Sequence, residues 1–211
     1  MSINTLLFDM DGTLIDTNAL IHESFVHTFN HYGLSFTDEE ILSFNGPPLY
    51  ETFMNIHPEL AGEMVDTYRA HNLANHDKYV KVFPTVVETL ERLKEKNIKM
   101  AVVSAKMRQG VELGLETTNL RQYFDSIVSV DDVTEPKPHP EPVIKAMKQL
   151  GGKRETSLMV GDNSHDIESG NSAGIKTVGV KWSSKGEAFL KQYDPTYMID
   201  EMSDILHIVG V

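Results

Sequence analysis

The short stretch over residues 5–13 constrains the fold more than any other part of the chain. Thr5–Phe8 is an apolar run that stops at Asp and Gly residues, which is typical of a buried strand ending in a loop. Asp9 and Asp11 therefore follow the carboxyl end of a strand, where ligands bind in open parallel sheets. Their carboxylates share a face in extended backbone, and Gly12 lets the chain turn straight after them. Two such anions repel each other and favour a bound cation; the alternative is a strand followed by an ordinary Asx turn.

Residues 16–81 have the periodicity of helices and show no convincing strand. Four segments with apolar residues at helical spacing run between residues 18 and 73, and a capping-box pattern at Thr37–Glu40 opens the second of them. We therefore predict an all-helical cap domain at 16–81. It is inserted into a core domain made of residues 1–15 and 82–211.

Beyond residue 82, helical and strand patterns alternate. The predicted helices lie at 84–96, from 108 onward, at 140–150 and at 167–173, and the predicted strands at 99–104, 126–130, 157–161 and 177–180. This alternation predicts an α/β fold with a doubly wound parallel sheet, into which the helical cap is inserted after the first strand. Right-handed crossovers place the loops that follow the strands along one rim.

Polar side chains follow each of the next three predicted strands. Ser104 ends the second strand, Lys137 lies in the Pro-rich segment 135–140 after the third, and Asp162 and Asp166 follow the fourth. Since these loops share one rim with the two N-terminal aspartates, we expect their side chains to surround one ligand. For Lys137 the alternative is an ordinary surface lysine.

The charge balance restricts the partners of the chain. Its 211 residues include 19 Lys and Arg against 31 Asp and Glu, a formal net charge of −12. Nucleic acid and anionic membranes are therefore not expected as partners, and a phosphate substrate would need local help from metal, lysine or amide groups. The chain has no cysteine, no signal-peptide pattern and no apolar run of membrane-spanning length. We expect a soluble cytoplasmic protein.

With these motifs the chain resembles the haloacid dehalogenase superfamily of phosphatases over essentially its whole length. Residues 9–13 (DMDGT) match the first signature, 102–104 the second, Lys137 the third and 161–166 (GDNSHD) the fourth. The resemblance implies a hydrolase that acts on a small anionic phosphate substrate through an aspartyl-phosphate intermediate. Phosphatases and phosphomutases of the superfamily carry the second aspartate of DMDGT, which its dehalogenases do not need.

The resemblance also implies a role for each rim residue. Asp9 would be the nucleophile, Asp11 the general acid and base, and Ser104 and Lys137 the groups that hold the phosphoryl oxygens. Mg²⁺ is the implied cofactor, because a cation must offset the repulsion between an attacking carboxylate and the phosphoryl oxygens. The implied ligands of Mg²⁺ are the Asp9 carboxylate, the Asp11 backbone carbonyl and Asp162, with Asp166 in the outer sphere.

The helical insertion resembles the C1 cap that closes over the site and selects substrates in this superfamily. Arg69, Asn72 and His76 follow i, i+3, i+7 spacing, so we expect them on one helix face. There they would either hold a second phosphate or form a solvated polar stripe. Gly46, in a Gly-Pro break before a helix, is another candidate for anion binding.

Several functions remain open. A narrower likeness to a bacillary pyrophosphatase, carried by stretches such as residues 44–53 and 131–142, implies hydrolysis of inorganic pyrophosphate. This would include the pyrophosphate formed when the phosphocarrier protein HPr is dephosphorylated on serine. A phosphatase of a small organic phosphomonoester, such as 2-phosphoglycolate, would use the same catalytic residues. An inorganic substrate requires cationic or amide groups around both ends, whereas an organic one requires some apolar lining.

Two further functions are less favoured. The sugar phosphomutases of this branch carry a cap histidine where this chain has Ile21, and His22 is turned about 100° away on the helix. A non-catalytic phosphate-binding module would be expected to have lost a catalytic residue. Every residue of the implied catalytic set is present.

Overall fold

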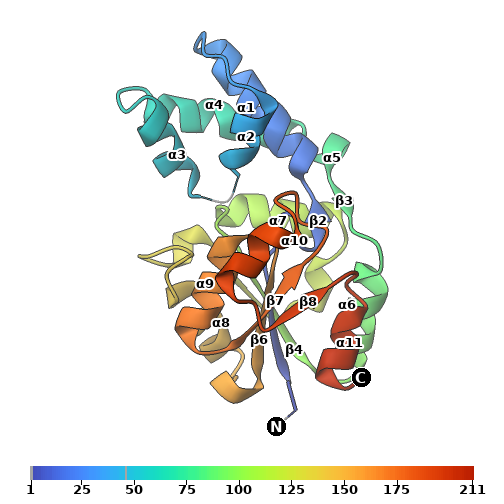
Figure 1. The fold of residues 1–211 in the computed structure, drawn as a ribbon. Helices are drawn as coiled ribbons and strands as arrows, with labels where there is room; N and C mark the ends of the chain where they lie inside the picture. The colour runs from blue at the N-terminus through green and yellow to red at the C-terminus, as the bar shows by residue number, and fades with distance from the viewer. Residues whose placement is uncertain (1, 46) are drawn as a thin grey trace.

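The computed structural model describes residues 2–45 and 47–211. In this part of the chain a six-stranded sheet forms the centre, with the order β5-β4-β1-β6-β7-β8 and every neighbouring pair parallel (Figure 1). Its strands are β1 (Thr5–Phe8), β4 (Lys99–Val103), β5 (Ser126–Val128), β6 (Ser157–Gly161), β7 (Lys176–Val180) and β8 (Tyr197–Ile199). The predicted α/β fold with a parallel sheet is confirmed.

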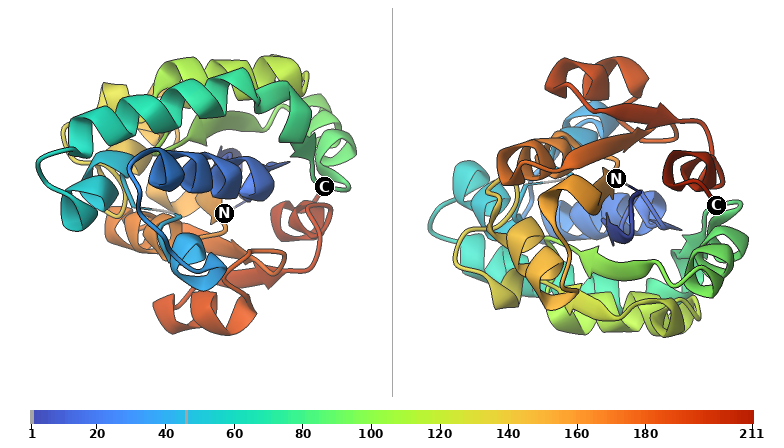
Figure 2. Two further views of the ribbon diagram at one scale, coloured as in Figure 1. Left: turned by 90° about the horizontal axis from the view of Figure 1, so that it is seen from above. Right: turned by 90° about the horizontal axis from the view of Figure 1, so that it is seen from below.

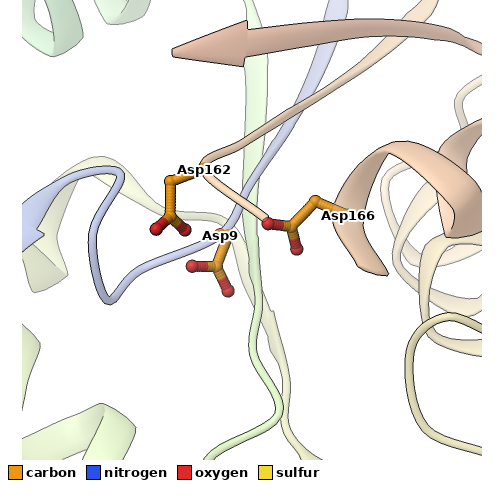
Figure 3. A group of neighbouring side chains, drawn as sticks. All are labelled: Asp9, Asp162 and Asp166. Carbon is orange, nitrogen blue, oxygen red and sulfur yellow. The ribbon is translucent and has the colours of Figure 1, made fainter. Parts of the chain in front are cut away.

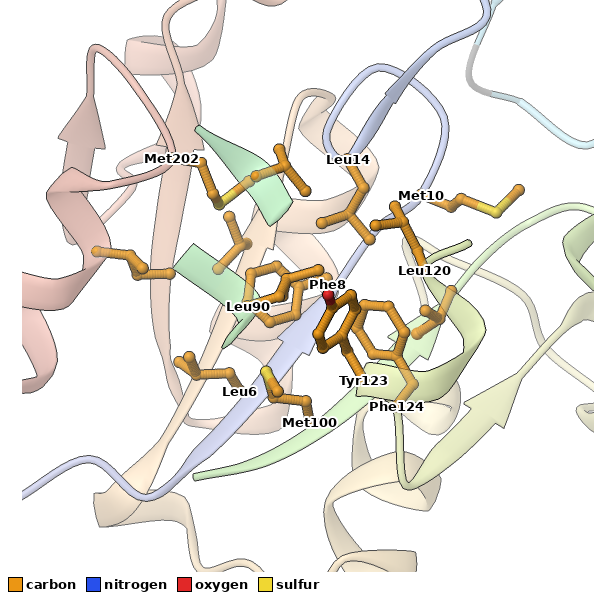
Figure 4. Packing of buried hydrophobic residues seen from close by; sticks show 14 of the residues in the cluster. Leu6, Phe8, Met10, Leu14, Leu90, Met100, Leu120, Tyr123, Phe124 and Met202 are labelled. Atoms are coloured by element: carbon orange, nitrogen blue, oxygen red, sulfur yellow. The ribbon is translucent and has the colours of Figure 1, made fainter. Parts of the chain in front are cut away.

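The first strand lies in the middle of the sheet, because β1 pairs with both β4 and β6. All four of its residues are buried. Leu6 and Phe8 belong to one apolar cluster and Leu7 to another, as expected when alternate side chains of a strand point to opposite faces. Phe8 packs edge-on against Phe124, with ring centroids 6.1 Å apart (Figure 4). The carboxyl end of β1 is therefore flanked by the carboxyl ends of two neighbours.

Helices cover both faces of the sheet, as the alternating pattern predicts. The cluster that contains Phe8 also takes in side chains of α6, α7 and α11, whereas the cluster that contains Leu7 takes in side chains of α8 and α9. The bounds of the core helices are α6 (Val86–Glu95), α7 (Arg108–Thr117), α8 (Glu141–Gln149), α9 (Ser164–Ala173), α10 (Glu187–Leu190) and α11 (Asp204–Val209). Short 3-10 turns lie at Arg121–Tyr123, Val130–Asp132, Arg154–Thr156 and Lys191–Tyr193.

The inserted segment forms a separate group of helices above the carboxyl rim of the sheet (Figure 1). These are α1 (Asn18–His31), α2 (Asp38–Ser43), α3 (Leu49–Ile56), α4 (Ala61–Ala74) and α5 (His76–Tyr79). The helices α1 and α4 run side by side (Figure 2). An aromatic-rich cluster around Phe25, Phe29 and Phe53 holds the group together, apart from the two clusters of the core. This separate cluster supports the proposal that residues 16–81 form a cap domain.

A small ribbon joins the cap to the core. β2 (Ile15–Asp16) pairs antiparallel with β3 (Lys81–Val82), so the two ends of the insertion run side by side. In addition, the Phe83 amide donates to the Leu14 carbonyl at 3.1 Å. The chain therefore leaves and re-enters the core at one place.

The structure differs from the sequence expectations at the end of the cap, in the C-terminal tail and at the start of α9. The fourth cap helix ends at Ala74 and a separate short helix, α5, follows it, although neither Gly nor Pro marks the break. The edge strand β8 and the helices of the C-terminal tail were not predicted; β8 spans three residues, two of them half-buried, and gives a weak pattern. The helix expected at 167–173 begins at Ser164, because the Asn163 side chain caps its first turn. None of the described helices combines the length and apolar character needed to cross a membrane.

Candidate active site

The two N-terminal aspartates stand at the centre of the rim, directly after β1. Gly12 makes the turn behind them with φ of +87°, a left-handed conformation that favours glycine. A Cβ at this position would lie 2.3 Å from Oδ2 of Asp162, so the glycine also makes room for that carboxylate. The loop after β1 and the loop after β6 therefore approach each other closely, as the sequence analysis predicts.

Three buried carboxylates converge there, from Asp9, Asp162 and Asp166 (Figure 3). Each offers a ligand oxygen within 4.8 Å of the others. Burial raises the pKa of Asp9 to about 7, although Lys137 counteracts the effect. Burial also raises the pKa of Asp162 well above its usual range, and the charges of Asp9 and Asp166 add to this rise. Three negative charges are therefore unfavourable together in this cluster, and a cation beside them would stabilise the ionised forms.

Lys137 supplies one buried cation to this cluster. Its Nζ donates to Oδ1 of Asp9 at 2.7 Å, to Oδ1 of Asp166 at 2.6 Å and to the Val103 carbonyl at 2.8 Å. Burial alone would lower the pKa of the lysine, but Asp166 and Asp9 outweigh burial and raise it. Lys137 is 4% exposed, so the alternative of an ordinary surface lysine is wrong. Its three ammonium protons all have acceptors.

Asp166 differs from the other two carboxylates in its hydrogen bonds. Its Oδ1 accepts from Lys137, and its Oδ2 accepts from the Asn163 amide at 3.0 Å. The second of these bonds belongs to the capping box that starts α9. Both oxygens are thus occupied by the protein, which supports the proposed outer-sphere place of Asp166.

A divalent cation fits the remaining donors. Three buried carboxylates share the rim with one buried ammonium, so the cluster carries excess negative charge, and oxygen donors are those that Mg²⁺ prefers. Asp9 and Asp162 would supply carboxylate oxygens, together with the proposed backbone carbonyl of Asp11.

Ser104 stands where the sequence places it, at the end of β4. Its amide donates to the Val128 carbonyl at 2.9 Å, and its Oγ accepts from the Lys106 amide at 3.1 Å. The hydroxyl lies on the cavity wall, and its own proton is left to donate to a ligand.

Several residues at the rim were not singled out from the sequence. The largest omission is Lys106, whose Nζ lies 3.1 Å from Oδ1 of Asp11. A lysine two positions beyond Ser104, in the same rim loop, was the signal that could have found it. Two hydroxyls also support Asp162: Thr13 Oγ1 donates to its Oδ1 at 3.5 Å, and Ser183 Oγ donates to its backbone carbonyl at 2.6 Å.

A cavity of about 280 Å³ lies between the rim and the cap. On the core side it is lined by the proposed catalytic residues together with Lys106, Met107, Gln109, Asn163 and His165. On the cap side most of the lining is apolar or aromatic, including Ile21, Phe25, Phe44, Pro47, Leu49, Tyr50, Tyr68 and Leu73. The cap and the core are also joined across it by a hydrogen bond from Asn163 Nδ2 to the Asn45 carbonyl, 3.4 Å long.

The cap candidates have different outcomes. Arg69 and Asn72 line the cavity, although Asn72 is buried and also donates to Ser24 Oγ at 3.3 Å. The expectation that His76 shares their helix face is wrong, because α4 ends at Ala74 and His76 starts α5. His76 is instead buried, and it is not among the described residues that line the cavity. The Gly46 candidate lies outside the described residues.

Comparison with known proteins gives a consistent result. A family model described as haloacid dehalogenase-like hydrolase matches residues 6–180. A protein of Oceanobacillus iheyensis named pyrophosphatase PpaX is 53% identical over 210 residues, covering 100% of this chain and 98% of its own. A protein of the same name from Anoxybacillus flavithermus is 51% identical over 212 residues, covering 100% and 99%. A crystal structure of a haloacid dehalogenase-like hydrolase from Bacteroides fragilis is similar with a TM-score of 0.90 and 25% identity, covering 96% of this chain and 99% of that one.

Proposed function

The chain belongs to the haloacid dehalogenase-like hydrolase family, and from this premise we propose that it is a Mg²⁺-dependent phosphohydrolase that cleaves inorganic pyrophosphate. The observation that carries the proposal is the rim itself. A buried carboxylate, Asp9, lines the cavity between rim and cap beside Asp11, and Lys137 and the acidic cluster surround it. The two relatives of about 50% identity that cover the whole chain bear the name of a pyrophosphatase.

The proposed reaction has two displacement steps. In the first, an Asp9 oxygen forms a bond to phosphorus while the bond from phosphorus to the bridging oxygen breaks, and Asp11 gives a proton to the departing phosphate. In the second, a water oxygen forms a bond to phosphorus while the bond from phosphorus to the Asp9 oxygen breaks, and Asp11 takes a proton from the water, which restores both residues. The sum is pyrophosphate and water converted to two phosphates.

The surrounding groups offset the charge that these steps develop. The Ser104 hydroxyl can donate to a phosphoryl oxygen, and the Lys137 ammonium, bonded to Asp9, keeps a fixed positive charge beside the reacting carboxylate. When bound, Mg²⁺ would add positive charge against the phosphoryl oxygens and the attacking carboxylate. Asp9 and Lys137 are both buried, and the low local dielectric around them strengthens these interactions.

The composition of the cavity also favours a second candidate. The apolar and aromatic lining from the cap is what an organic phosphomonoester such as 2-phosphoglycolate requires, and inorganic pyrophosphate does not need it. On the other side, Arg69 and Lys106 line the same cavity and suit the second phosphate of pyrophosphate. These two cations and the names of the relatives support pyrophosphate as the first candidate.

Two remaining alternatives receive little support. Ile21 lines the cavity at the position where phosphomutases of this branch carry histidine, and His22 instead lies 3.0 Å from Asp38 on the cap surface. A non-catalytic module is disfavoured because Asp9, Asp11 and Lys137 are all present and in contact with other rim groups. A cytoplasmic location, and a source of pyrophosphate in the dephosphorylation of HPr on serine, stay predictions.

Steady-state kinetics test the proposal. Phosphate release is measured with the purified protein and Mg²⁺ on pyrophosphate, 2-phosphoglycolate, sugar phosphates and an aryl phosphate. We expect kcat/KM for pyrophosphate to exceed that for each organic ester by at least about 100-fold, which corresponds to a difference of roughly 3 kcal/mol in transition-state binding. A higher value for 2-phosphoglycolate than for pyrophosphate would establish the second candidate instead. Chelation of the metal should abolish turnover, and added Mg²⁺ should restore it.

A further inference from the structure

The two lysines of the cavity differ in what their ammonium groups can still bind. Lys137 donates its three ammonium protons in hydrogen bonds to Asp9, Asp166 and the Val103 carbonyl. Lys106 has one side-chain hydrogen bond among the described residues, to Asp11, and 21% of its side chain is exposed where it lines the cavity. Of the two, Lys106 is therefore the one that can pair with a further anion.

The position of Lys106 is fixed by its backbone. Its amide donates to Ser104 Oγ at 3.1 Å, and its carbonyl accepts from the Val130 amide at 3.2 Å. These two bonds tie the loop after β4 to its neighbours.

The aliphatic stem is also held in place. It lies over Gly110 in the first turn of α7, where a Cβ would come within 3.1 Å of Cγ, Cδ and Cε of the lysine. The absence of a side chain at position 110 thus makes a seat for this stem. These contacts distinguish Lys106 from a lysine that merely projects from the surface.

The pairing with Asp11 sets where the ammonium acts. In the proposed reaction Asp11 gives its proton to the departing oxygen, so that oxygen must come within hydrogen-bond distance of its carboxyl group. The Nζ of Lys106, 3.1 Å from Oδ1 of Asp11, would then lie within roughly 7 Å of the departing oxygen. At this distance in a partly enclosed cavity, a cation distinguishes between a charged and a neutral leaving group.

We propose that Lys106 selects substrates whose leaving group is anionic, above all the phosphate that departs from pyrophosphate, by pairing with it while it holds the side chain of Asp11 in place. Arg69 lines the same cavity from the cap and adds a second cation on that side. The inference deepens the proposed function and rests on it for the identity of pyrophosphate as the natural substrate.

The first test compares three variants: Lys106→Met, which keeps the stem and removes the charge; Lys106→Arg, which keeps the charge; and Lys148→Met, an exposed lysine of α8, as control. We expect Lys106→Met to lower kcat/KM for pyrophosphate by at least about 100-fold, and for phenyl phosphate, whose protonated leaving group is neutral, by less than about 5-fold. Lys106→Arg should recover most of the preference, and Lys148→Met should change neither value. Equal losses of Lys106→Met on both substrates would show that the residue only positions Asp11, and would overturn the inference.

A second pair of substrates separates this inference from the proposed function. Phenyl phosphate and 4-carboxyphenyl phosphate differ in the charge of the leaving group and not in the phosphoryl group. If the wild-type protein fails on pyrophosphate, the proposed function falls, yet Lys106→Met should still lose more on the carboxylated ester. If it loses no more there, the inference falls as well.

A variant at the seat keeps the inference testable even if Lys106→Met does not fold. Gly110→Ala pushes on the lysine stem without touching its charge, since the added Cβ meets three carbons of that stem. We expect a smaller loss in the same direction, about 3- to 10-fold for pyrophosphate and none for phenyl phosphate. No selective loss in this variant or in a folded Lys106→Met would contradict the proposal.

Discussion

The rim of the sheet and the cap that faces it are built on different physical grounds. At the rim, the buried carboxylates of Asp9 and Asp166 are far apart in the sequence. They lie close together because they follow the ends of two adjacent parallel strands, β1 and β6. In the cap, packing between aromatic rings holds the helices together. The ring centroids of Phe25 and Tyr68 are 4.8 Å apart, and those of Phe29 and Phe36 are 4.4 Å apart.

The polar groups of the two regions also differ. Rim carboxylates point toward the cavity, whereas several cap hydroxyls and imidazoles satisfy each other within the cap. Ser24 Oγ lies 3.1 Å from His71 Nδ1, and Tyr32 Oη lies 3.2 Å from Thr67 Oγ1. The difference teaches that chemistry is fixed by the rigid sheet, while the cap contributes shape and a small number of charges. Substitutions in the two regions should therefore affect different quantities.

The strongest test of this contrast is Asp9→Asn. It should lower turnover by at least about 10⁴-fold, because the proposed nucleophile is lost. The fold should persist, since burial already raises the pKa of Asp9 to about 7 and a neutral amide costs little there. Phosphate release and thermal unfolding measure the two effects, with the exposed cap residue changed in Asp66→Asn as control. Substantial turnover by the folded Asp9→Asn protein would remove this residue from the mechanism.

Lys137→Met should affect stability and activity together. Removal of the ammonium leaves Asp9 and Asp166 buried with no cation beside them, at an expected cost of about 3–5 kcal/mol in the free energy of unfolding. Turnover should fall at least about 10³-fold, since the charge beside the proposed nucleophile is lost. Urea titration and phosphate release are the measurements. A variant as stable as the wild-type protein would show that the three-way contact of Lys137 is not needed to hold the rim.

Arg69→Ala should change specificity and leave the chemistry intact. Because Arg69 lines the cavity from the cap, its loss should raise KM for pyrophosphate about 10-fold and KM for an aryl phosphate less than about 2-fold, with kcat nearly unchanged for the aryl phosphate. Steady-state kinetics on the two substrates decide the matter. Equal increases of KM would exclude Arg69 from substrate selection.

The smallest effect is expected from His76→Leu, which concerns stability alone. His76 is 1% exposed, and both of its ring nitrogens are without a hydrogen-bond partner among the described residues. Burial, with a contribution from Lys106, lowers the pKa of His76. The unfolded chain therefore binds a proton more readily than the folded one, and stability falls as the pH drops below about 6.5, the usual pKa of histidine.

The replacement should remove this loss. We expect His76→Leu to be more stable by about 1–2 kcal/mol near pH 8, and by more near pH 5.5. Urea titrations at the two pH values test it, with the exposed residue changed in His207→Leu as control. A gain that does not depend on pH would mean that His76 binds protons equally well in the folded and the unfolded chain, contrary to the stated cause.

The rim could be predicted from the sequence to a large extent because its residues follow directly on strands. Asp9, Ser104 and Asp162 each come within two residues of the end of an apolar run, and parallel strands bring those ends to one edge. The pairing of Lys106 with Asp11 could not be predicted, because it joins loops 95 residues apart. The periodicity of apolar residues predicts which segments of the chain are strands. It contains no information on which side chains of the loops contact one another.

The sequence predicts the helical character of the cap, but it does not predict which cap side chains face the cavity. The capping box of Thr37 and Glu40 is present, with the Glu40 amide donating to Thr37 Oγ1 at 3.3 Å. The end of α4, however, depends on how the chain returns to the core, and His76 leaves the helix face that its spacing suggests. Tertiary contacts of this kind have no local sequence signal.

Because β2 pairs with β3, the whole cap could be exchanged for another segment without a change to the core. Ile15 lies opposite Val82 and Asp16 opposite Lys81, so both ends of the insertion sit about 5 Å apart, the spacing of one strand pair. The core therefore closes in the same way whatever the length of the segment between them. Recombination or grafting could replace the whole segment, so that the same core domain would act on different substrates.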